Sequence, residues 1–140
     1  NMGAFVVGGG GGGTRHNNRP GGGGGTVCAT FDVDQVGGAG SSVSITVGGG
    51  GGGGNPNPGG NGGQSKFGNF VIANGGNGAW NSPGNRGNGS ENITTYFTGI
   101  GSPGTSTGVD IGAEPGLAPG SRGGGGGFNS GATGSVLVFY

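Results

Sequence analysis

Four uninterrupted glycine blocks constrain the fold of this chain more than any other feature: residues 8–13, 21–25, 48–54 and 123–127. Glycine loses more conformational freedom on folding than any other residue, so an ordered glycine block needs a large compensating gain. Such blocks therefore either remain flexible linkers or use their missing side chains to bring backbones into direct contact.

The segments between the blocks favour a folded chain. Apolar and polar residues alternate there with a period of two, which is typical of half-buried strands. The formal net charge of +0 differs from the high net charge of most disordered chains. No stretch has helical periodicity, and glycine opposes helix formation. We expect a mostly irregular and β fold with almost no α-helix, an apolar island at residues 66–73, and short strands at residues 4–7, 26–33, 42–47 and 135–140.

A helix of the polyproline-II type suits the glycine blocks, with three residues per turn and about 3.1 Å rise. It makes no internal hydrogen bonds, so every N–H and C=O must find a partner on a neighbouring segment. The sequence thus predicts packed polyglycine-II helices that contain Gly10, Gly23, Gly51 and Gly125. The longest block, residues 48–54, has glycine on all three faces and is the predicted central helix.

This interpretation makes Gly51→Val strongly destabilising, whereas Gly59→Val, in a Pro/Asn-rich loop, is expected to be mild. The length predicts one glycine-rich domain over residues 1–140. The start at Asn1 favours a processed product or part of a longer protein. Cys28 cannot form an internal disulfide, since it is the only cysteine, and it is expected to be a small buried apolar residue. No apolar run is long enough to predict a membrane-spanning helix.

An ordered set of short motifs runs along the chain. Val-Ser-Ile-Thr-Val enters the 48–54 glycine block, and Gly-Gly-Gln-Ser-Lys-Phe-Gly follows at residues 62–68. Ala-Asn-Gly-Gly-Asn-Gly occupies residues 73–78, and Gly-Ser-Val-Leu-Val-Phe-Tyr closes the chain. This order resembles the glycine-rich C-terminal domain of bacteriophage tail fibre and minor tail proteins. More loosely, it is similar to the polyglycine-II adhesins at the fibre tips of T-even-type phages.

The resemblance implies an extracellular domain of the virion that recognises the host through loops at the end of a fibre. The receptor would be a protein or polysaccharide of the bacterial surface. Further partners would be the fibre shaft or other tail proteins, with a homotrimer as one arrangement. Neither nucleic-acid binding nor membrane insertion is implied.

Loops on a rigid scaffold are where binding residues concentrate, and Trp, Tyr and Arg are enriched at binding hot spots. We expect the receptor-binding side chains to lie in the loops between glycine segments. The alternative for the aromatic residues is a small core beneath those loops. The candidate receptor-binding residues are Arg15, His16, Arg19, Trp80, Arg86 and Tyr96.

No catalytic, metal or cofactor site is predicted. Asp32 and Asp34 share one strand face at i, i+2, but they precede a turn, where solvated aspartates are common. His16 is the only histidine and lacks companion metal ligands. The few basic residues form no stripe for nucleic acid. We therefore expect binding without catalysis.

Two other classes of protein are alternatives. Polyglycine-II bundles also underlie a springtail antifreeze type, but that type has long regular Gly-X-X repeats and paired cysteines. A structural wall or silk-like protein would show an internal repeat, and this chain has none.

Overall fold

The computed structural model describes residues 2–91, 95–99 and 130–140. Within them there is no α-helix, and the only helical elements are two short 3-10 turns. The predicted fold class, mostly β and irregular, is confirmed. The elements are β1 (Met2–Val7), η1 (His16–Asn18), β2 (Thr26–Phe31), η2 (Val33–Val36), β3 (Ile45–Thr46), β4 (Ser65–Phe67), β5 (Val71–Ala73), β6 (Gly89–Glu91), β7 (Thr95–Gly99) and β8 (Ser135–Phe139).

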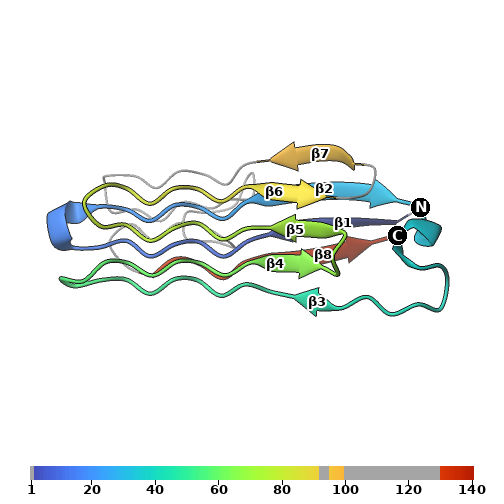
Figure 1. Cartoon of the computed structure of the whole chain (residues 1–140), viewed down its shortest axis with the longest axis horizontal. Coiled ribbons are helices and arrows are strands. Elements are labelled where there is room, and N and C mark those ends of the chain that lie inside the picture. Colours follow the sequence, from blue (N-terminus) through green and yellow to red (C-terminus); the bar gives the residue numbers. More distant parts are fainter. Residues whose placement is uncertain (1, 92–94, 100–129) are drawn as a thin grey trace.

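The strands gather at one end of an elongated molecule, and both termini lie at that end (Figure 1). They form two antiparallel four-stranded sheets, with the strand orders β7-β2-β1-β8 and β3-β4-β5-β6. The strands β1 and β2 of the first sheet pack on β5 of the second. From this end, extended segments run side by side to a tip that carries η1 (Figure 1).

The space between the sheets holds the apolar core. Its alternating side chains are small or branched, and Val6 and Val27 are completely buried. Two larger rings, Phe31 and Phe67, meet across the sheets with their centroids 5.5 Å apart. The buried cluster is Ala4, Val6, Val27, Ala29, Phe31, Val36, Phe67, Val71 and Ala73.

The extended segments are joined by backbone hydrogen bonds that repeat every three residues. Gly8 and Gly11 donate to the carbonyls of Gly25 and Gly22, at 2.9 and 2.8 Å. The same spacing occurs wherever two neighbouring segments share more than one bond, as a three-fold helix of the polyglycine-II type requires. The described segments are residues 8–13, 20–25, 48–54, 59–64, 74–79, 84–88 and 130–134.

The centre of this bundle is the 8–13 segment, so the prediction for the 48–54 segment was wrong. Every residue from 8 to 13 is buried. Gly10 donates to Ala132 and accepts from Gly51, and further bonds link this segment to three others. In the 48–54 segment only every third glycine is buried, among them Gly51. The 48–54 segment therefore lies at the rim. A segment is central when other segments are hydrogen-bonded to it on every side, and its own glycine content does not decide this.

Of the other two glycines predicted to lie in packed helices, Gly23 and Gly125, the structure describes only Gly23. Gly23 is buried and its carbonyl accepts from the amide of Gly87 at 2.8 Å. Gly125 lies outside the described residues. The Pro/Asn-rich loop was placed wrongly, since residues 59–64 form a bundle segment. A Cβ on Gly59 would collide with the carbonyl group of Gly12, so Gly59→Val is not mild.

The predicted strands at residues 4–7 and 135–140 are confirmed, and two others are shorter than expected. The strand predicted over residues 26–33 ends at Phe31, because Asp32 is the N-cap of η2 and its amide donates to Oε1 of Gln35 at 3.0 Å. The prediction that Asp32 and Asp34 share a strand face was therefore wrong. Of the strand predicted over residues 42–47, only β3 forms.

Candidate functional site

Three described loops meet at the tip of the bundle. These are the loop with η1, the turn at residues 54–58 and the turn at residues 79–83. Thr14 is completely buried, and its hydroxyl donates to the carbonyl of Asn57 at 2.7 Å. Its backbone pairs with Arg19 in both directions. These hydrogen bonds hold the loops of the tip in place.

An aromatic stack connects two of these loops. The rings of His16 and Trp80 lie 4.2 Å apart between centroids, with an interplanar angle of 17°. The amide of His16 also donates to the hydroxyl of Thr14 at 3.1 Å. Trp80 remains 38% exposed despite the stack. It thus presents a large, fixed ring to solvent and is not part of a core beneath the loops.

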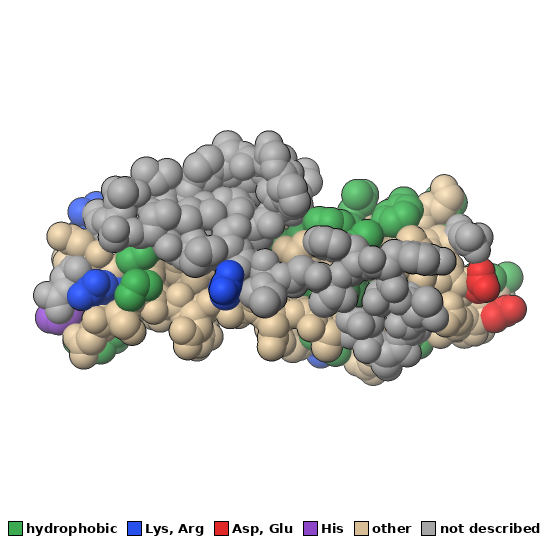
Figure 2. Space-filling view, turned by 90° about the horizontal axis from the view of Figure 1, so that it is seen from above, with side chains coloured by type: hydrophobic (Ala, Val, Ile, Leu, Met, Phe, Trp, Pro, Cys, Tyr) green, Lys and Arg blue, Asp and Glu red, His purple; other side chains and the backbone are tan. Residues whose placement is uncertain are grey.

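Two arginines lie in the loop that carries His16. Arg15 is exposed, and its backbone amide donates to Gly54 at 3.0 Å. Arg19 is half-buried, and its Nε has no hydrogen-bond partner. No described acidic side chain pairs with either. Figure 2 shows the histidine and basic side chains at one end of the molecule, further basic side chains near its middle, and acidic side chains at the opposite end. The tip is therefore a cationic and aromatic surface.

The remaining candidate residues lie elsewhere. Arg86 is exposed on the 84–88 segment, along the flank of the bundle. Tyr96 belongs to β7, at the sheet end. The structure therefore brings Arg15, His16, Arg19 and Trp80 together, and it separates Arg86 and Tyr96 from them. The loop at residues 54–58 is a tip component that the sequence analysis did not single out, although its two prolines indicate a fixed turn.

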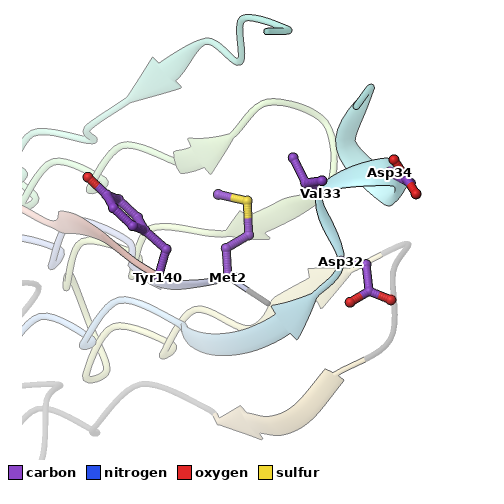
Figure 3. Close-up of a pocket in the computed structure, with 5 residues that line it drawn as sticks. All are labelled: Met2, Asp32, Val33, Asp34 and Tyr140. Atoms are coloured by element: carbon purple, nitrogen blue, oxygen red, sulfur yellow. The ribbon is translucent and has the colours of Figure 1, made fainter. Parts of the chain in front are cut away.

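A shallow hollow lies at the opposite end, close to the C-terminus. It is lined by Met2, Asp32, Val33, Asp34 and Tyr140. Figure 3 shows the two carboxylates pointing away from each other instead of into a common space. Within the described residues, no group of three or more His, Cys, Asp or Glu side chains is placed to hold a metal ion.

Cys28 lies on β2 and is half-buried. Burial raises the pKa of its thiol above the ordinary value, because a thiolate would be poorly solvated there. No helix in the described part of the chain is long and apolar enough to span a membrane.

Comparison with known proteins identifies one family. The family model described as a glycine-rich domain matches residues 1–137. A search of curated proteins and a search of solved structures each return no match. The described glycine-rich segments in that range are the ones that build the bundle and lead into its tip. Because the match spans nearly the whole chain, the protein belongs to the glycine-rich domain family.

Proposed function

We propose that this chain is a receptor-binding domain at the tip of a bacteriophage tail fibre, and that it binds a bacterial surface receptor without catalysis. The observation that carries the proposal is the tip itself. A bundle of glycine-rich segments holds Trp80 and His16 stacked, with Arg15 and Arg19 in the same loop as His16. Both termini lie at the other end (Figure 1), so attachment of further protein there leaves this surface free.

The chemistry of the tip suits bacterial surfaces. These present anionic sugars, phosphate groups and protein loops, and a guanidinium binds carboxylate or phosphate in a bidentate manner. The fixed Trp80 ring offers an apolar plane for a sugar or an apolar side chain. A rigid aromatic residue between cations is the composition expected of a binding hot spot.

The test is a titration of the fluorescently labelled domain on a panel of bacterial strains, with a melting curve for each variant. Trp80→Ala is expected to lower affinity for the bound strain about thirtyfold, since a hot-spot truncation removes about 2 kcal/mol or more. Arg86→Ala, on the flank, is the matched control and should bind like the parent. Equal binding by the parent and Trp80→Ala would remove the basis of the proposal.

A further inference from the structure

A second surface, apart from the tip, consists of side-chain amides in two rows. It lies on three neighbouring segments, residues 59–64, 74–79 and 84–88, which run side by side on the near face in Figure 1, green to yellow. Each segment carries an amide at two positions three residues apart. We call this set the amide face: Asn61 and Gln64, Asn74 and Asn77, and Asn85 and Asn88.

Hydrogen bonds show that these amides are neighbours across the segments. In one row, Nε2 of Gln64 donates to Oδ1 of Asn74, and Nδ2 of Asn74 donates to Oδ1 of Asn88, both at 2.7 Å. In the other row, Oδ1 of Asn61 accepts the amide of Gly78 at 2.8 Å. The first row is thus a continuous chain of bonded amides, and the second is fixed to the same scaffold.

The floor between the amides of the 59–64 and 74–79 segments is bare backbone, because the residues between the two amides of each segment are glycines. Gly75 and Gly78 face the 59–64 segment, and a Cβ on either would collide with its backbone. The three-residue repeat of each segment places successive amides roughly 9 Å apart along the axis. The face is therefore a regular array on a rigid backbone, and not a set of surface residues scattered over loops.

The second row is available to a ligand. Asn77 and Asn85 are exposed, and neither side chain makes a hydrogen bond within the described part of the chain. Each free amide offers two donors and an acceptor. None of the six side chains is charged, so the array suits a neutral partner rich in hydroxyl groups that both donate and accept. Repetition along the axis suits a partner that is itself a repeating chain.

We propose that the amide face binds an extended neutral polysaccharide that lies along the bundle axis. This inference rests on the proposed function, because the polysaccharide is then a component of the bacterial surface. The amide face is neutral and the tip is cationic, so the two would bind different components of the bacterial surface. Asn77 and Asn85 would supply the hydrogen bonds, while the bonded row of Gln64, Asn74 and Asn88 keeps the array fixed.

The experiment is biolayer interferometry of the purified chain on immobilised dextran, mannan, galactan and cello-oligosaccharides, with hyaluronan as the charged polymer. The parent is expected to bind a neutral polymer and not hyaluronan. The double variant Asn77→Asp, Asn85→Asp keeps side-chain shape but removes the donors, and should weaken binding at least about tenfold. Asn69→Asp, an exposed turn residue between β4 and β5, is the matched control for added charge and should bind like the parent.

Several outcomes would overturn the inference: no binding of the parent to any neutral polymer, equal binding by the double variant, or preference for hyaluronan. Inhibition of ice recrystallisation by the parent, lost in the double variant and without polysaccharide binding, would reassign the face to ice.

Cell binding distinguishes the amide-face proposal from the tip proposal. If Arg15→Ala lowers cell binding while the double variant does not, the tip function stands and the amide face fails. If polysaccharide binding depends on the amides but no tip variant changes cell binding, the tip proposal fails instead.

Discussion

The first segment of the chain passes through two kinds of interior without a break. As β1 it has two hydrogen-bonded neighbours, β2 and β8, which lie in one sheet. From Gly8 onward the same backbone is bonded to five other segments, residues 20–25, 48–54, 59–64, 74–79 and 130–134. The sheet end is filled by apolar side chains, whereas the interior of the bundle is filled mainly by backbone.

The difference follows from where the two structures point their amides. A strand directs its N–H and C=O groups to two sides, so its faces must be covered by side chains. A three-fold helix directs them to three sides, so neighbours surround it completely when no Cβ intervenes. The bundle thus gains order from hydrogen bonds and close contacts, and the sheets gain it from the removal of apolar surface from water. Added side-chain volume should therefore be the most harmful change in the bundle, and removed side-chain volume the most harmful change in the sheets.

Added volume at the centre of the bundle should have the largest effect. A Cβ on Gly12 would collide with the carbonyl group of Gly52, and the whole 8–13 segment is surrounded. We expect Gly12→Val to lose about 3 kcal/mol or more of unfolding free energy, at or beyond the upper end of ordinary overpacking. Urea denaturation would measure this. A loss below about 1 kcal/mol would mean that the backbone around Gly12 shifts to accommodate the side chain as easily as a surface loop does.

Removed volume should be the harmful change at the sheet end. Val27 is completely buried between the sheets, and its side chain fills the space that Gly89 leaves open. Val27→Ala should lower the unfolding free energy by about 2 kcal/mol, from lost transfer energy and a residual cavity. The exposed Val33→Ala is the matched control and should change it by less than about 0.5 kcal/mol. Equal losses in the two variants would show that the sheets lack a packed core.

The rim of the bundle allows a comparison of adjacent residues. A Cβ on Gly51 would collide with the carbonyl group of Gly60, whereas no atom of the described residues beyond its chain neighbours lies within 4 Å of a Cβ on Gly52. We expect Gly51→Ala to cost about 1.5 kcal/mol. Gly52→Ala should be neutral or stabilising by up to about 1 kcal/mol, because alanine restricts the unfolded chain. Melting curves of the pair test the three-fold register, and equal shifts would contradict it.

The smallest expected effect concerns the outer side of β2. Because burial raises the pKa of Cys28, its thiol stays protonated in the folded protein to a higher pH than in the unfolded chain. This contribution to stability is complete below the ordinary thiol pKa of 9.0 and is lost as pH rises through the folded value. Iodoacetamide at pH 8 should label Cys28 more slowly in the native protein than in urea. Equal rates would indicate a fully solvated thiol.

The sequence predicted the sheet end better than the bundle. Alternation sufficed for β1 and β8, since period two is a local property. Whether a glycine segment is central depends on partners distant in sequence, so block length was misleading for residues 48–54. Residues 55–64 were interpreted as one loop because prolines and asparagines are frequent there, and this hid the 59–64 segment with Asn61 and Gln64. Those two residues stand three apart with glycines between them, as do Asn74 and Asn77, and this spacing was the available signal.

The sequence predicted which residues lie in the tip loops, but not which of them contact one another. Trp80 and the cations Arg15 and Arg19 were expected in loops, and they lie there. The stack between His16 and Trp80 joins residues far apart in sequence, which only the fold brings together. Arg86 is close to Trp80 in sequence, yet it lies along the flank, because residues 84–88 form another bundle segment.

The three-residue repeat also sets a rule for how such a protein can change its length. An insertion of three residues into a segment moves the chain on by one turn and restores each outward side chain to the same face. An insertion of one or two residues rotates everything beyond it, so that an outward residue such as Asn77 would point into the bundle. Lengthening by whole turns must occur in neighbouring segments together, since they share hydrogen bonds. The tip loops do not follow this rule, because they are not part of the three-residue repeat. They can vary in length while the bundle segments keep their register.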